Sequence, residues 1–364
     1  MSQIKRGIHV PESPEESAVQ RKLVGVVVVL GIVLTALFLL APGPPQNEGF
    51  DGEELFDPSL PSGVLEFTSS PLPEDSIQYI IPLGNLGPPG HTTPTDHIYF
   101  VYGPTAVEVV APAAGRVLRI ENFEGSGDQG ITIGVTDSYS YYFFHIILDD
   151  GISVGDWIEA GQRLGTTAPP SAFDLGVLNK SLVNPFANPD RYPEDKIHAD
   201  APLKYFKEPI RSALYAKVAR TGEDKDGKIC YDEPGKLIGN WWSSDAPSDL
   251  LSAENYESYA IAFVYSNFEP DRVMISIGCN FSGDGLTSGA YYAVGPKPEN
   301  VTPASGKVTY ILYEYIQGQN PVVGERVGLL IVEMLNEGTI KVQAFADTVS
   351  ATREFTSDAK TYLR

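Results

Sequence analysis

GHTTPTDH (90–97), VVAPAAGRV (109–117), YYFFHI (141–146), ISVGDWIEAGQRLG (152–165) and FDLGV (173–177) follow one another in this order along the chain. In this stretch short apolar runs alternate with glycine-containing turns, a pattern typical of short strands in a β domain. We expect these strands at Ala106–Val110, Gly115–Ile120, Ile131–Val135 and Tyr139–Ile147.

In this order the five segments resemble the signatures of lysostaphin-type zinc endopeptidases, which cut peptide cross-links in bacterial cell walls. The hairpin VGDWIEAGQRLG (154–165) is the most similar part. The resemblance covers only this stretch of the 364 residues. It implies a lysostaphin-like β domain built on a duplicated hybrid motif, which we place at residues 64–200.

The resemblance also implies a site. Zinc hydrolases of this kind use three protein ligands and leave one position open for water. His91 stands at the position of the family's first metal ligand, and Asp96 at that of the second, one residue later than in the family. His145 stands where the isolated catalytic histidine belongs. Asp174 takes the place of the third metal ligand, a histidine in the family, and Ala172 that of a second catalytic histidine.

These departures predict a damaged reaction centre. Two carboxylates would neutralise much of the charge of Zn²⁺, so bound water would be acidified less. Loss of a catalytic histidine costs about 10²–10³ in rate. We therefore expect a degenerate module that binds or regulates cell-envelope material, with Zn²⁺ as its candidate cofactor. The alternative is an active zinc metalloendopeptidase that cuts wall or surface peptide cross-links.

Two further histidines lie near this set. His97 follows Asp96 directly and, on a strand, would point to the opposite face. His198 could fold back toward His91, or it could be a surface or helix-capping residue.

The segments APAAGRV (111–117) and VGDWIEAGQRLG are also similar to the biotinyl/lipoyl hammerhead domain. Such a carrier needs a modifiable lysine on an exposed hairpin. Residues 111–177 contain no lysine, which argues against that function.

An uncharged run, Leu23–Ala41, precedes the β domain. Its 19 residues would form a helix roughly 28 Å long, enough to cross a bilayer core. Lys5, Arg6, Arg21 and Lys22 precede it, and no Lys or Arg follows it before Arg116. The positive-inside rule therefore places residues 1–22 in the cytoplasm and the rest outside. We expect a single-pass membrane protein with an acidic linker at 42–63. A cleaved signal peptide is the alternative.

The C-terminal half predicts a second β domain. Pro209 and the apolar spacing after it predict a helix over Glu208–Ala219, within a helical connector at 201–230. Residues 231–364 then carry six strand candidates at the spacing of an all-β barrel or sandwich: Tyr259–Tyr265, Arg272–Gly278, Ala290–Val294, Lys307–Ile316, Val327–Leu335 and Thr339–Ala346. Gly239-Asn-Trp241 is similar to the opening of lipocalin-type barrels, and a core-packing tryptophan is the alternative.

Charge and cysteine content limit the partners. The net charge of −21 argues against nucleic acid, which needs clustered Lys and Arg. We expect a membrane and a cell-envelope polymer or peptide as partners. Cys230 and Cys279, the two cysteines, could form a disulfide outside the cell or remain thiols.

Overall fold

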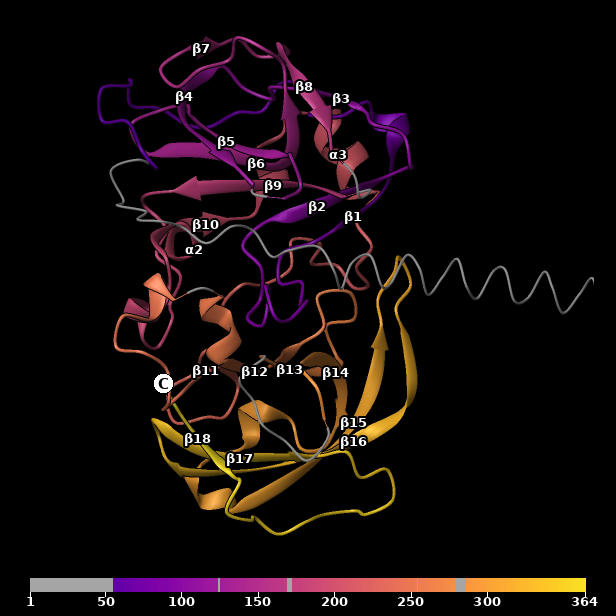
Figure 1. Cartoon of the computed structure of the whole chain (residues 1–364). Coiled ribbons are helices and arrows are strands. Elements are labelled where there is room, and N and C mark those ends of the chain that lie inside the picture. The colour runs from indigo at the N-terminus through magenta and orange to yellow at the C-terminus, as the bar shows by residue number, and fades with distance from the viewer. Residues whose placement is uncertain (1–54, 124, 169–171, 254, 279–285) are drawn as a thin grey trace, which may run out of the picture. The chain divides into compact units, whose positions relative to one another are not determined.

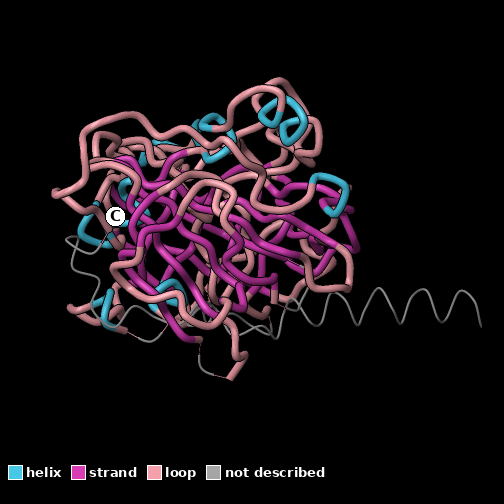
Figure 2. The backbone as a smooth tube through the Cα atoms, turned by 90° about the horizontal axis from the view of Figure 1, so that it is seen from above, coloured by secondary structure: helices cyan, strands magenta, loops and turns pink. Residues whose placement is uncertain are grey.

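The computed structural model describes residues 55–123, 125–168, 172–253, 255–278 and 286–364. These residues form mainly β structure with a few short helical turns, as Figure 2 shows. They belong to one compact unit, Pro42–Arg364. The predicted transmembrane helix at 23–41 lies outside the described ranges. Within those ranges, no helix combines the length and apolar character needed to cross a bilayer.

The N-terminal part is a single antiparallel sheet of ten strands (Figure 1). The strands are β1 (Ile77–Ile81), β2 (Ile98–Tyr102), β3 (Glu108–Val110), β4 (Gly115–Asn122), β5 (Gln129–Gly134), β6 (Tyr139–Leu148), β7 (Trp157–Ile158), β8 (Arg163–Thr167), β9 (Ala172–Asn179) and β10 (Ala199–Asp200). The four strands expected in this part correspond to β3, β4, β5 and β6.

The order of the main path is β1-β2-β9-β6-β5-β4-β7. Strand β10 pairs with β9, and β8 pairs with both β3 and β6. Strands β2, β9 and β6 are therefore neighbours, although they lie far apart in the sequence. This arrangement brings the segments around His97, Asp174 and His145 to adjacent strands.

A continuous apolar core lies against this sheet. Phe100, Phe143 and Phe173 come from the three neighbouring strands and are fully buried. Burying a side chain of this size stabilises a fold by about 1.5–3 kcal/mol. Tyr141 adds a hydroxyl that donates to the Ala113 carbonyl at 2.9 Å. The sheet that carries the candidate site is thus packed against an apolar core on one face.

Short helical segments flank the sheet. One of them, η2 (Glu74–Ser76), precedes β1. Four follow β9: η3 (Pro189–Arg191), α2 (Glu194–His198), η4 (Pro202–Tyr205) and α3 (Ile210–Tyr215). The connector helix is thus shorter than Glu208–Ala219. Pro209 is its N-cap rather than a first-turn residue. The helix ends early because Lys217 and Ala219 bond to Ile80 of β1: Ile80 N–H donates to the Lys217 carbonyl, and Ala219 N–H donates to the Ile80 carbonyl.

The C-terminal part is a closed antiparallel barrel of eight strands (Figure 1). They are β11 (Gly239–Ser243), β12 (Ala260–Tyr265), β13 (Val273–Ile277), β14 (Gly289–Val294), β15 (Lys307–Ile316), β16 (Val322–Asn336), β17 (Thr339–Phe345) and β18 (Lys360–Leu363), with η5 (Leu250–Ser252), η6 (Tyr256–Tyr259), η7 (Pro298–Asn300) and η8 (Pro303–Ser305) between them. All six strand candidates are confirmed, and of the two expected architectures the barrel is present.

Trp241 lies inside this barrel. It is fully buried, and its indole N–H donates to the Leu237 carbonyl at 2.8 Å. The Arg364 guanidinium stacks on the ring, 4.1 Å from its centroid. The ring therefore packs in the core of the barrel. Cys230 is a buried free thiol, and Cys279 lies outside the described residues.

Candidate functional site

The candidate site begins as one row of side chains across three strands. Asp174 of β9 pairs with Tyr99 of β2 on one side and with Phe144 of β6 on the other. Residues directly opposite each other in antiparallel strands point to the same face of the sheet. Asp174, Tyr99 and Phe144 therefore share a face, and Tyr142 joins them two residues along β6.

A β-bulge brings His145 to this same face. In the pairing of β5 with β6, Gln129 is opposite Ile146 and Ile131 is opposite Phe143, so β6 carries one extra residue. His145 lies at this bulge with φ +62, in the left-handed region. Such a conformation costs roughly 1–3 kcal/mol for a residue other than glycine. In return, the imidazole faces Asp174 instead of the opposite side of the sheet.

Asp174 lies between two imidazoles. Its Oδ2 is 3.5 Å from His97 Nε2 and 3.7 Å from His145 Nε2. The Asp174 side chain is 3% exposed, and its Oδ1 accepts no hydrogen bond. A buried carboxylate is costly unless opposite charges lie beside it. The two histidines are the groups placed to supply that charge.

Each imidazole also has a carboxylate at its other nitrogen. His97 Nδ1 donates to Asp96 Oδ1 at 2.9 Å, and His145 Nδ1 donates to Asp128 Oδ2 at 2.6 Å. His97 Nε2 is also 2.9 Å from the Tyr99 hydroxyl. The result is a chain of groups, Asp96–His97–Asp174–His145–Asp128, in which carboxylates and imidazoles alternate.

The alternating carboxylates and imidazoles shift the pKa values of His97 and His145. Burial disfavours the charged imidazolium of His97, but Asp174 and Asp96 outweigh burial and raise its pKa. The pKa of His145 is raised in the same way, with burial opposed by Asp128 and Asp174. Burial raises the pKa of Asp174, and the two imidazoles oppose that shift. The charges of the cluster are therefore mutually dependent.

His91 lies apart from the chain of contacts. Its ring centroid is 5.4 Å from that of His97, with the ring planes near perpendicular. Burial, aided by the charges of His97 and Lys196, lowers the pKa of His91 to about 3. The imidazole of His91 is thus neutral at physiological pH. Its backbone pairs with Gly87, which fixes the loop that carries it.

The three metal ligands expected from the sequence, His91, Asp96 and Asp174, are not arranged around one zinc position. Asp96 contacts Nδ1 of His97, whereas Asp174 contacts Nε2 of the same ring, so an imidazole separates the two carboxylates. His91, Asp96 and Asp174 therefore do not converge on one point. Among the residues placed by the structure, no group of three or more His, Cys, Asp and Glu side chains is arranged to hold a metal ion. Asp174 Oδ1, which has no hydrogen-bond partner, is a single possible metal ligand, whereas structural or catalytic zinc needs at least three protein ligands.

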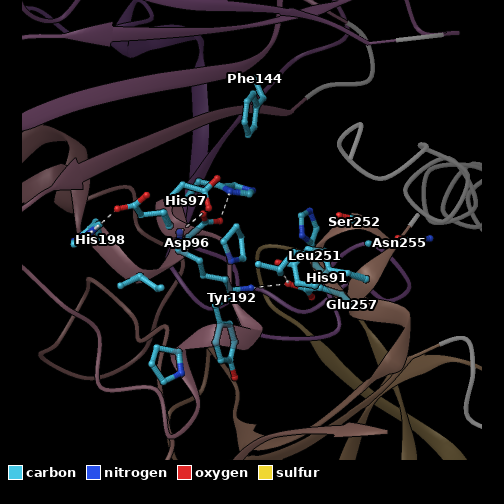
Figure 3. Close-up of a pocket in the computed structure, with 18 of the residues that line it drawn as sticks. His91, Asp96, His97, Phe144, Tyr192, His198, Leu251, Ser252, Asn255 and Glu257 are labelled. Carbon is cyan, nitrogen blue, oxygen red and sulfur yellow. Dashed lines mark hydrogen bonds and ion pairs between the residues drawn. The ribbon is translucent and has the colours of Figure 1, made fainter. Parts of the chain in front are cut away.

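A cavity of about 530 Å³ opens beside this cluster. Figure 3 shows His91, Asp96 and His97 among the residues around it. Its walls come from the sheet and the loop before β2, from the segment 189–198 that contains α2, and from residues 251–252 and 255–257, which precede β12. Ten of the 21 lining residues are Phe, Tyr, Asp or Glu: Phe123, Phe144, Tyr192, Tyr256, Asp96, Glu121, Asp190, Glu194, Asp195 and Glu257.

A buried ion pair closes one wall of this cavity. Lys196 Nζ of α2 lies 2.6 Å from Glu257 Oε1 of η6, and the two side chains are 4% and 5% exposed. Thr93 joins them: its backbone N–H donates to Glu257 Oε2 and its hydroxyl donates to Oε1, both at 2.7 Å. Three segments far apart in the sequence are thus tied together at the edge of the cavity.

The structure brings some of the sequence-based candidates together. Asp174 and His145 are in contact, Asp96 reaches them through His97, and His91 lies nearby. Ala172, in the place of a catalytic histidine, is buried at the start of β9. The roles suggested for His91, Asp96, Asp174 and His145 stay predictions.

The orientation expected for His97 is wrong. Strand alternation would turn His97 away from Asp96, but β2 begins only at Ile98. The loop before β2 folds the imidazole onto Asp96 instead. His198 ends α2 and lines the cavity, and its Nδ1 donates to the Leu182 carbonyl at 2.6 Å.

Three residues of the site were missed by sequence reasoning. Asp128 lies in a glycine-rich turn and gives no signal apart from its position before β5. Lys196 and Glu257 are 61 residues apart, and no local pattern connects them.

Comparisons with known proteins give a local likeness only. No protein family and no curated protein matches the sequence. Csd3 of Helicobacter pylori is 15% identical over 42% of this chain and 36% of its own, with a TM-score of 0.29. A zinc-containing peptidase from Vibrio cholerae is 15% identical over 35% of this chain and 37% of its own, with a TM-score of 0.23. The lysostaphin catalytic domain from Staphylococcus simulans is 18% identical over 36% of this chain and 93% of its own, with a TM-score of 0.26.

These structural neighbours are domains of the M23 or lysostaphin type. The chain spans 34–36% of the length of the two Csd3 structures. Because the TM-scores lie far below 0.5, the likeness carries no argument about the function of this chain.

Proposed function

We propose that this chain is a non-catalytic, peptidase-like module that binds peptide material of the cell envelope. One observation carries the proposal: Asp174 Oδ2 lies 3.5 Å from His97 Nε2 and 3.7 Å from His145 Nε2. A hydrolase would need such imidazole nitrogens for a metal ion or for proton transfer to substrate. In this chain both nitrogens face the buried Asp174 carboxylate, and Ala172, which stands in the place of the second catalytic histidine, can neither accept a proton nor stabilise an oxyanion.

The cavity supports binding without turnover. A volume of about 530 Å³ lies within the range of sites that hold small ligands or part of a peptide. Aromatic walls offer apolar contact area, and the acidic side chains offer hydrogen-bond acceptors. The kind of ligand, envelope peptide, is suggested by the resemblance of residues 90–177 to wall-directed endopeptidases.

The place of action is part of the same proposal. The uncharged run at 23–41 follows four basic residues, and no Lys or Arg comes after it before Arg116. This asymmetry supports a single membrane anchor with the β domains outside the cytoplasm. A module held there would meet envelope polymers directly.

Binding can be tested by co-sedimentation of the full-length protein with purified cell-envelope material. Ser252 lines the cavity and is exposed, so Ser252→Trp should fill the entrance and reduce the bound fraction. Ser357→Trp is the matched control, because Ser357 is equally exposed but does not line the cavity. Equal binding by both variants would refute the assignment of the cavity as the binding site.

The alternative, an active zinc metalloendopeptidase, is an outcome of the same experiment. Release of soluble peptide fragments by the wild-type protein, lost in His145→Ala, would establish it.

A further inference from the structure

Glu257 is bound by the rest of the chain as a peptide carboxylate would be bound. Four donors surround its two oxygens: the Thr93 backbone N–H, the Thr93 hydroxyl, the Lys196 ammonium and the Tyr256 hydroxyl. The first three lie at 2.6–2.7 Å and the fourth at 3.3 Å. Hydrogen bonds to charged groups at such distances are the strong ones in proteins.

Two of the three donor residues, Thr93 and Lys196, lie far from the carboxylate in the sequence, whereas Tyr256 is its neighbour in η6. Thr93 precedes β2 and Lys196 lies in α2, whereas Glu257 lies in η6, a four-residue turn before β12. Lys196 Nζ also bonds the Thr93 hydroxyl at 2.5 Å, so Lys196 and Thr93 form one preorganised unit. We call Thr93, Lys196 and Tyr256 the carboxylate cradle.

The cradle borders the cavity. Lys196, Tyr256 and Glu257 all line it, and Thr93 lies directly behind Lys196 and Glu257. Figure 3 shows Glu257 at the cavity. A lysine that is 4% exposed requires an anion beside it, because an unpaired buried charge is costly. Asp96 and Asp195 line the same cavity and would repel a second carboxylate. The cradle therefore admits one carboxylate at a time.

We propose that the carboxylate cradle is a binding site for the free carboxylate of a peptide ligand, and that Glu257 occupies it as an internal substitute until such a ligand displaces it. The inference deepens the proposed binding function, since it names the group by which the cavity recognises its ligand. Glu257 then competes with the ligand for the same donors.

The test uses acetate, because Glu257→Ala removes one methylene and the carboxylate, which together match acetate. We measure the thermal unfolding of full-length Glu257→Ala protein in sodium acetate and in sodium chloride of equal ionic strength. The melting temperature should rise with acetate concentration relative to chloride. Acetamide, which has the same shape but no charge, should give no rise, and the wild-type protein should not distinguish acetate from chloride.

Lys196→Met/Glu257→Ala is the matched control, because it lacks both the charge and its partner. Acetate-specific stabilisation should be lost in this double variant. A peptide probe extends the test. N-acetyl-glycylglycine should bind Glu257→Ala more tightly than the wild-type protein. N-acetyl-glycylglycine amide, which lacks the free carboxylate, should bind the two proteins equally.

Equal melting temperatures in acetate and chloride would overturn the proposal, as would an equal effect of acetamide or an acetate effect that survives in the double variant. If Glu257→Ala folds only in acetate, that recovery supports the proposal; if it folds in neither salt, the cradle does not accept a free carboxylate. These results do not depend on envelope binding, so the proposed function and the cradle can fail separately.

Discussion

Gly176 offers a sharp test of the sheet register at the candidate site. A Cβ added at Gly176 would lie 2.0 Å from Cζ and 2.4 Å from the hydroxyl oxygen of Tyr142. Ordinary van der Waals contact begins at 3.4 Å, so the ring would have to move by about 1.4 Å. Tyr142 is 3% exposed and pairs directly with Gly176, so it has little room to move.

Gly176→Ala should therefore lower the free energy of unfolding by about 2–3 kcal/mol, near the upper end of overpacking costs. The corresponding fall in melting temperature is roughly 4–8 °C, measured by calorimetry. Gly318→Ala is the control, because no heavy atom lies within 4 Å of its added Cβ, and it should leave the melting temperature unchanged.

A double-mutant cycle with Tyr142→Ala separates the clash from other effects. Tyr142→Ala alone should cost about 3–5 kcal/mol, as large-to-small changes of buried aromatic residues do. Gly176→Ala should add little in that background, because the ring it would strike is gone. A Gly176→Ala protein as stable as wild type, or additive costs in the cycle, would show that β6 and β9 do not pair in this register.

Three further predictions concern the charged groups. The pKa of Asp128 is lowered, because hydrogen bonds from His145 and Ser126 outweigh burial, and the pKa of His145 is raised; their pair therefore stabilises the fold most between the reference values of 3.8 and 6.5. The stabilisation by this pair weakens at lower pH as Asp128 gains a proton, and at higher pH as His145 loses one. Asp128→Asn should therefore lower the melting temperature more at pH 5 than at pH 9. A larger effect at pH 9 would contradict the expected direction of the pH dependence. Lys196→Met should cost about 3–5 kcal/mol in denaturant unfolding, because it leaves the Glu257 carboxylate buried and unpaired, whereas Lys196→Met/Glu257→Gln should cost less than the single change; additive costs would count against a direct pair. Because the described donors do not converge, EDTA and added zinc should leave the melting temperature unchanged, and a zinc-dependent rise would show a site that the geometry does not contain.

The sequence predicts the β-rich fold well because strands and turns leave local signals. Alternating apolar residues between glycine turns place β3 to β6 and all six barrel strand candidates near their observed bounds. The pairing of the strands is not predicted by such local signals. Strands β2 and β9 are neighbours although more than 70 residues separate the paired positions, and no local pattern encodes that contact. The shortened connector helix has the same cause, since its last residues are held by β1.

The candidate site is less predictable than the fold. His145 could be singled out from its motif, but the bulge that turns its imidazole toward Asp174 depends on pairing with β5. Strand alternation does not predict the orientation of His97, because His97 lies in the loop before β2. The buried pair of Lys196 and Glu257 exists only in the folded chain, where it balances two charges that the sequence alone would place at the surface.

On this proposal, the cavity beside the Asp174 cluster binds envelope material without hydrolysing it. The most direct measurement incubates full-length protein with purified cell-envelope material and follows both the bound fraction and the appearance of new primary amines in one reaction. The account predicts that protein accumulates on the material while the amine level stays at that of a protein-free control. Amine release by the wild-type protein that disappears in His145→Ala would contradict it.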